Sequence, residues 1–134
     1  MLLALSKKNS QDAIIKMINW SLPNKAKLSG SHLIGLNLPN FVNAIMSKTV
    51  DTNLYHDLNA CNKYLVTEET IKNINTSCLI IAGKQDIMTP LKSGFKLNKL
   101  LKNSSIEVLE ECGHFHIHEK SNEIRKIINK YIEN

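Results

Sequence analysis

Two short apolar runs near the C-terminus constrain the fold of this 134-residue chain more than any other feature. The first, Cys78–Ala82, is β-branched at its centre and is closed by Gly83. A continuous apolar run of this length is typical of a strand covered on both faces, as in a parallel sheet. The second run, Ser105–Glu110, carries Ile106 and Val108 on one face and predicts the next strand. The C-terminal part of the chain is therefore predicted to contain two strands.

Helical patterns follow each of these predicted strands. Thr89 suits the N-cap and Pro90 the first turn of a helix that ends near Lys102. A final helix is predicted from Glu119 to about Ile132, because four apolar residues follow the i, i+3, i+4, i+7 pattern: Ile124, Ile127, Ile128 and Tyr131. The order strand–helix–strand–helix predicts an α/β fold with two parallel strands and a right-handed crossover.

Residues 1–75 show helical patterns and no strand pattern. Four helices are predicted there, starting near Ser10, Pro39, Asp51 and Glu68, the last with Thr67 as its N-cap. The stretch 25–31 is predicted to be a break. We therefore divide the chain into a helical region, 1–75, and an α/β region, 76–134.

Composition excludes several classes of function. Hydrophobic residues make up 43% and charged residues 22%, which is typical of a soluble globular domain. The net charge of +5 comes from lysines spread along the chain, whereas a nucleic-acid interface is expected to show a basic stripe. The apolar runs fall far short of the ~20 residues that cross a membrane. Three cysteines without a CxxC pair predict free thiols and a cytoplasmic protein.

An acid and a histidine follow the two predicted strands. Asp86 lies four residues after Ala82, and His114 lies four residues after Glu110. Parallel strands lie ~4.8 Å apart and end at one edge of the sheet, so the two side chains are expected to meet. A catalytic histidine needs an acceptor at one ring nitrogen, which Asp86 can supply. Gly113 is expected to permit a tight turn directly before the histidine.

These residues carry a resemblance to a known family. The segment 76–132 resembles the C-terminal end of an α/β-hydrolase through Gly83-Lys-Gln-Asp86, Thr89-Pro90, Gly113-His114 and Glu119. The order of Asp before His matches the Ser…Asp…His order of that fold. The resemblance implies a partial α/β-hydrolase fold in which 1–75 is a helical lid or cap and 76–134 is the C-terminal part of the core. It also implies that Asp86 is the triad acid and His114 the general base.

The nucleophile that would complete such a triad is not in this sequence. No Gly-x-Ser-x-Gly occurs, and the neighbours of Ser31 and Ser93 do not fit a nucleophile elbow. We expect a fragment of an esterase-like serine hydrolase, inactive alone, that acts on a small ester-like substrate with a serine from an upstream segment. The alternative is a non-catalytic ligand-binding or interaction protein derived from the same fold. No cofactor is expected.

Three further patterns leave their interpretation open. His114, His116 and His118 form H-x-H-x-H, but no residue at ligand spacing completes a metal site, so no metal is predicted and the last two are expected in a loop beside the site. Cys112 is expected to be a small buried apolar residue rather than a nucleophile. Substrate-binding residues remain unknown, because four apolar side chains fit either an acyl pocket or core packing: Trp20, Phe41, Met46 and Leu54.

Overall fold

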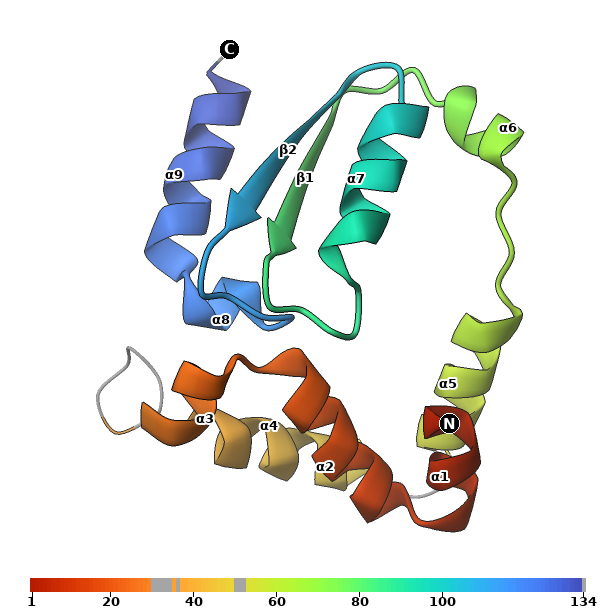
Figure 1. Ribbon diagram of the computed structural model, residues 1–134, viewed down its shortest axis with the longest axis vertical. Helices are drawn as coiled ribbons and strands as arrows, with labels where there is room; N and C mark the ends of the chain where they lie inside the picture. The colour runs from red at the N-terminus through yellow and green to blue at the C-terminus, as the bar shows by residue number, and fades with distance from the viewer. Residues whose placement is uncertain (30–34, 36, 50–52, 134) are drawn as a thin grey trace.

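The computed structural model describes residues 1–29, 35, 37–49 and 53–133 as a mixed helix and strand architecture (Figure 1). In chain order its elements are α1 (Leu2–Lys8), α2 (Ser10–Ser21), α3 (Asn24–Ser29), α4 (Leu38–Met46), η1 (Ser47–Thr49), α5 (Asn53–Lys63), α6 (Glu68–Lys72), β1 (Cys78–Gly83), α7 (Leu91–Leu100), β2 (Ser104–Leu109), α8 (His116–Glu119) and α9 (Ser121–Ile132). The predicted α/β class is confirmed.

The two strands pair in parallel, as the sequence predicts. Their register runs from Cys78 opposite Ser104 to Gly83 opposite Leu109. β2 begins and ends one residue earlier than the predicted 105–110. Both strands point toward the loops that carry Asp86 and His114, so these loops leave the sheet at the same edge (Figure 1).

A helix covers each face of this small sheet. Gly94 of α7 lies against Ile80, Ala82 and Ile106, and the missing side chain at Gly94 allows the helix to lie close to the strands. On the opposite face Ile124 of α9 is buried in a cluster with Leu109 and Cys112, against which Ile81 and Ile127 pack. Figure 1 shows the strands between α7 and α9. The uninterrupted apolar run in β1 therefore meets helices on both sides.

The helical region has a core of its own. Five buried residues from α2, α4 and the residues beside them form it: Ile14, Ile18, Leu22, Leu38 and Val42. Phe115, from the loop after β2, packs against this cluster. The helices α2 to α4 thus lie across the carboxyl ends of the strands (Figure 1).

The predicted break of the helix that starts near Ser10 is confirmed, because α2 ends at Ser21 and Leu22 has an extended backbone, but the chain then forms a further helix that was not predicted. Helix α3 occupies Asn24–Ser29, and the amide of Lys27 donates to the carbonyl of Pro23 at 3.1 Å. Proline lacks an amide hydrogen and has a helical φ, so at this position Pro23 begins a helix. Residues 30 and 31 lie outside the described residues.

Other boundaries also differ from the predicted ones. Helix α1, with Lys7 and Lys8 in its last turn, was not predicted. The predicted final helix is two helices, because Lys120 has φ −136° and ψ 37°, which is not helical. The predicted start at Asp51 lies outside the described residues. The N-cap at Thr67 is as predicted, because its side chain accepts a hydrogen bond from the amide of Thr70.

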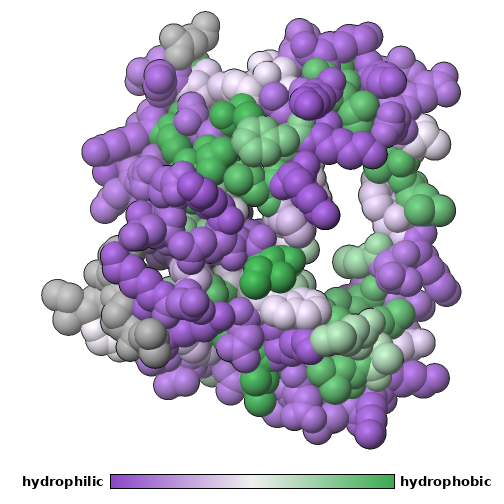
Figure 2. Space-filling model, viewed as in Figure 1, coloured by the Kyte–Doolittle hydropathy of each residue, from purple (hydrophilic) through white to green (hydrophobic). Residues whose placement is uncertain are grey.

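The connection from α5 to α6 runs apart from the rest of the molecule. It contains three exposed apolar residues, Tyr64, Leu65 and Val66, of which Leu65 is 92% exposed. Figure 2 shows an opening between this connection and the body of the protein. An exposed run of this kind marks a surface that is not covered within the described part of the chain.

Across the described ranges, no helix combines the length and the apolar character needed to cross a membrane.

Candidate active site

Asp86 and His114 meet at the edge of the sheet where both strands end. His114 Nδ1 lies 2.8 Å from Asp86 Oδ2, although 28 positions separate the two residues. The Asp86 side chain is 5% exposed and that of His114 is 39% exposed. In the described residues no hydrogen bond is formed at Nε2 of His114, the nitrogen that faces away from the acid. The predicted juxtaposition of acid and histidine is therefore present in the structure.

Thr89 is a third member of this cluster that the sequence reasoning assigned to a different role. Its amide donates to Asp86 Oδ1 at 2.9 Å, and its hydroxyl donates a short hydrogen bond to Asp86 Oδ2. The hydroxyl is also 3.3 Å from His114 Nδ1. Helix α7 consequently has Pro90, not Thr89, at its N-cap position. The spacing Asp-x-x-Thr was the available signal, because an aspartate often accepts from the amide three residues later.

These hydrogen bonds determine the charge state of the acid. Burial by itself raises the pKa of Asp86, but the Thr89 hydroxyl, the Thr89 amide and His114 together lower that pKa below its ordinary value. Asp86 is thus held as a carboxylate beside the imidazole. A carboxylate at this position fixes the proton of the neutral ring on Nδ1 and stabilises the imidazolium.

Two glycines allow the two loops to touch. A Cβ built on Gly83 would lie 2.2 Å from the carbonyl oxygen of Gly113, and one built on Gly113 would lie 2.1 Å from the carbonyl oxygen of Ser21. The expectation of a tight turn at Gly113 needs correction, since the residue with a left-handed backbone here is Glu111, with φ 49°. Gly113 is required because backbone approaches it closely, not because of its own φ.

The last turn of α2 holds both loops through its carbonyl groups. The carbonyl of Trp20 accepts from the amide of Ile87 at 3.1 Å, and the carbonyl of Ser21 accepts from the amide of His114 at 2.6 Å. These carbonyls are unpaired within the helix because they lie in its last turn. The helical region thereby contacts the loop of the acid and the loop of the histidine directly.

An apolar cavity of about 380 Å³ opens beside His114. Residues of α2, α4, α8 and the two loops line it: Met17, Ser21, Phe41, Val42, Ile45, Met46, Met88, His114, Phe115 and His118. No Asp, Glu, Lys or Arg is among these lining residues. Its size lies within the ~300–1,000 Å³ of small-molecule sites.

The four apolar residues left open by the sequence divide into two pairs. Phe41 and Met46 line the cavity. Leu54 packs against the helical core, and the ring of Trp20 lies 5.2 Å from the ammonium of Lys16. Trp20 and Leu54 are not among the lining residues.

The three histidines have separate contacts. His116 Nδ1 lies 2.9 Å from the carbonyl oxygen of His114, and the His118 ring meets Phe41 edge to face at 6.0 Å. His116 and His118 lie in α8, not in the predicted loop. Within the described ranges, no three His, Cys, Asp or Glu residues are grouped in a way that suits a metal ion.

Cys112 is fully buried beside the histidine loop. Burial, with a contribution from Glu119, raises the pKa of its thiol to about 12. A thiol with such a pKa is a poor source of thiolate, which agrees with the expected role as a small buried residue.

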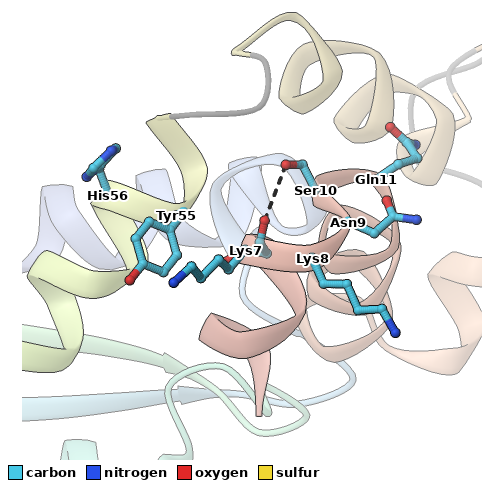
Figure 3. Close-up of a pocket in the computed structure, with 8 residues that line it drawn as sticks. Lys7, Lys8, Asn9, Ser10, Gln11, Tyr55 and His56 are labelled. Carbon is cyan, nitrogen blue, oxygen red and sulfur yellow. Dashed lines mark hydrogen bonds between the residues drawn. The ribbon is translucent and has the colours of Figure 1, made fainter.

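A second hollow lies away from the dyad, between the junction of α1 and α2 and helix α5 (Figure 3). Its volume is about 470 Å³ and its lining includes Lys7, Lys8, Tyr55 and His56. Figure 3 shows Lys7 extending toward Tyr55 while Lys8 points away. The two ammonium groups therefore do not converge on one point of the hollow.

Comparison with known proteins gives a consistent set of relatives, although no family model matches the chain. Over 66 residues it is 27% identical to 2-hydroxy-6-oxo-2,4-heptadienoate hydrolase of Pseudomonas putida, a match that covers 49% of this chain and 24% of that protein. A solved thermophilic esterase superposes with a TM-score of 0.81 at 24% identity, over 98% of this chain and 49% of that one. A hydrolase from Oleispira antarctica superposes with a TM-score of 0.78 at 17% identity, over 99% of this chain and 45% of that one. The chain thus spans about half the length of these solved hydrolases.

Proposed function

We propose that this chain, whose fold is that of the C-terminal portion of an α/β-hydrolase, supplies the acid and the base of a serine hydrolase. The observation that carries the proposal is the 2.8 Å contact between Asp86 and His114 at the rim of an apolar cavity. In this proposal Nε2 of His114 takes the proton of a serine hydroxyl as the serine attacks an acyl carbon. The same nitrogen then returns that proton to the leaving group, while Asp86 stabilises the imidazolium.

The serine and the donors of the oxyanion hole are proposed to come from a segment outside these 134 residues. Two features support this. The described sheet has two strands, so the edge of β1 that faces away from β2 has no strand partner among the described residues. The apolar residues around Leu65 are exposed as well. An unpaired strand edge and an exposed apolar segment are both suited to further chain packing against them.

We assign residues 1–75 to a lid and 76–134 to the end of the hydrolase core. The lid helices α2 and α4 supply most of the cavity wall opposite His114. Since that wall is apolar and uncharged, the acyl part of the substrate is proposed to be uncharged and apolar, as in a simple ester. The esterase and the heptadienoate hydrolase among the relatives support a small-molecule substrate of this kind.

The test is to express the chain together with the coding sequence that precedes Met1 and to assay it on a series of short-chain esters. We expect ester hydrolysis that falls about 10³- to 10⁴-fold when His114 is replaced by Ala, because the general base is lost. The exposed His56, on α5, provides the matched control, and His56→Ala is expected to keep full activity. Preceding sequence without a Gly-x-Ser-x-Gly elbow would sink the catalytic proposal.

The apolar cavity also favours a second candidate, a protein that binds an apolar ligand without reaction. The four methionines distinguish the two, because Met17, Met46 and Met88 line the cavity whereas Met1 is 80% exposed. Methyl-labelled methionine NMR with a short-chain ester as probe, on the chain expressed with its preceding sequence, reports binding at three methionines of the cavity and uses Met1 as the internal control. Binding without hydrolysis, unchanged in Asp86→Asn, would favour the second candidate.

A further inference from the structure

A buried glutamate lies next to the dyad and takes no part in the proposed chemistry. Glu119, the last residue of α8, is 6% exposed. Its Oε2 accepts a hydrogen bond of 2.9 Å from the amide of Gly113, the residue directly before His114. Its Oε1 is buried and has no hydrogen-bond partner among the described residues.

This contact closes a short loop around the histidine. The side chain of Glu119 reaches back six residues to Gly113, while the Glu119 amide donates to the carbonyl of Phe115 at 2.9 Å. The amide of His114 itself donates to Ser21. The backbone is therefore fixed immediately before His114, at His114 and immediately after it. With the backbone held in this way, the ring reaches Asp86 through two side-chain torsions.

Stability alone does not account for an acid at this position. A buried carboxyl group without a cationic partner costs free energy, and an apolar side chain of similar size avoids that cost. In the described part of the chain no ion pair involves Glu119. What the carboxyl group provides and an apolar group does not is an acceptor for the Gly113 amide. Without that acceptor the amide would be buried and unpaired, so the loop would have to shift.

We propose that Glu119 is a positioning residue, which holds the Gly113 amide and thereby places the His114 ring for its contact with Asp86. The proposal rests on the role of His114 as the base proposed above. Burial raises the pKa of Glu119, although the hydrogen bond from the Gly113 amide opposes the rise. A neutral carboxyl group still accepts through its carbonyl oxygen, and the holding contact does not depend on charge.

The experiment follows the His114 imidazole by NMR in the full chain, with no substrate and no nucleophile. Glu119→Gln keeps a carbonyl oxygen at the same place, whereas Glu119→Leu and the unbranched Glu119→Met remove it. Glu123, an exposed acid in the first turn of α9, gives the matched control Glu123→Leu. We expect the hydrogen-bonded Nδ1 proton of His114 in the wild type, in Glu119→Gln and in Glu123→Leu. In the Leu and Met variants at 119 that signal is expected to be lost or to exchange at least about tenfold faster.

A Leu or Met variant at 119 that folds and keeps the Nδ1 signal and its exchange rate would overturn the proposal. So would failure of both variants to fold while Glu123→Leu folds, because Glu119 would then be needed for folding itself. Retention of the signal in Glu119→Gln, together with its loss in Glu119→Met, is not predicted by a role in packing alone, because only Gln keeps the acceptor. Because the NMR signal does not require turnover, it tests the role of Glu119 separately from the hydrolysis assay. In a catalytically complete protein, Glu119→Met is expected to lower kcat about tenfold or more with little change in KM.

Discussion

Two buried acids lie near His114, Asp86 in the loop after β1 and Glu119 at the end of α8, and their surroundings shift their pKa values in opposite directions. Asp86 receives three hydrogen bonds, from the Thr89 amide, the Thr89 hydroxyl and His114. Glu119 receives one from Gly113 at Oε2, and its Oε1 has no partner among the described residues. Both side chains are more than nine-tenths buried. The two acids therefore differ in the hydrogen bonds they receive and not in how deeply they are buried.

This difference in hydrogen bonding shifts the pKa values of the two groups in opposite directions. Burial raises the pKa of both acids, but the donors around Asp86 more than offset burial and lower its pKa. At Glu119 burial prevails and the pKa is raised. The surroundings of Asp86 thereby favour its charged form beside the imidazole, whereas those of Glu119 disfavour the charged form. Donor supply, more than depth of burial, separates the proposed catalytic acid from the proposed positioning residue.

The largest effect on stability is expected where the two loops touch. Gly113→Ala places a Cβ 2.1 Å from the carbonyl oxygen of Ser21, and Gly83→Ala places one 2.2 Å from that of Gly113. Because both obstacles are backbone atoms, the histidine loop must move away from α2 in Gly113→Ala and away from the end of β1 in Gly83→Ala. We expect each variant to lose about 3 kcal/mol or more of unfolding free energy, measured by urea denaturation. The separation would disturb the surroundings of both acids at once.

Gly94→Ala is the control for these variants. Its Cβ would meet Cδ1 of Ile106 at 3.3 Å, the end of a flexible side chain, and Ala favours the helix. We expect a change of about 1 kcal/mol or less in either direction. A Gly113→Ala protein as stable as the wild type would mean that the close contact between α2 and the histidine loop is not needed.

The pH dependence of the unfolding free energy tests the difference between Asp86 and Glu119, because the two acids are expected to change it in opposite directions. The pKa of Asp86 is lowered from 3.8, so its contribution is present above about pH 4 and is lost as pH falls through the folded-state pKa. The pKa of Glu119 is raised from 4.5, so its contribution is present below about pH 4.5 and is lost as pH rises through the folded-state pKa. Asp86→Asn should therefore be destabilising near neutral pH, by about 1–2 kcal/mol, and less so once pH has fallen through the folded-state pKa of Asp86.

Glu119→Gln should show the reverse trend. Relative to the wild type it should gain stability as pH rises from acidic to neutral, because Gln has no proton to lose in the buried site. The titratable groups that face Glu119 are His116 and Cys112, and neither is changed in this variant. Urea unfolding at a series of pH values provides the measurement, with the exposed Glu123→Gln as a flat reference. Parallel curves for the two variants would contradict the opposite pKa shifts of the two buried acids.

The fold and the dyad are predictable from sequence because their signals are local. An apolar run that ends in glycine gives a strand end, and two such ends in one parallel sheet give a shared edge for Asp86 and His114. The partners from α2 gave no such signal, because every residue has a carbonyl group and its direction depends on how the helix packs. Glycine is needed at position 113 because α2 packs against it. No sequence signal marks that contact, so the glycine was wrongly attributed to a local turn.

The roles of Thr89 and Glu119 were obscured by a competing interpretation. Each lies beside a helix start, so capping and helix patterns accounted for them without reference to the dyad. Thr89 instead donates to Asp86, and Glu119 ends α8 with its side chain turned back to Gly113. Near a site, a polar residue at a helix terminus is therefore worth testing for contacts with the loop that precedes the helix.

The smallest effect is expected from the ion pair that joins the starts of the two loops. Lys84 Nζ lies 2.9 Å from both carboxylate oxygens of Glu110, with side chains 54% and 68% exposed. Such exposed ion pairs contribute little to the free energy of unfolding, because water and salt screen the charges and two long side chains lose conformational freedom. Lys84→Met should change the unfolding free energy by about 0.5 kcal/mol or less at low and at high salt, and should leave the His114 Nδ1 proton in place. A loss comparable to that of Gly113→Ala would mean that charge, and not the close backbone contact at the glycines, holds the two loops together.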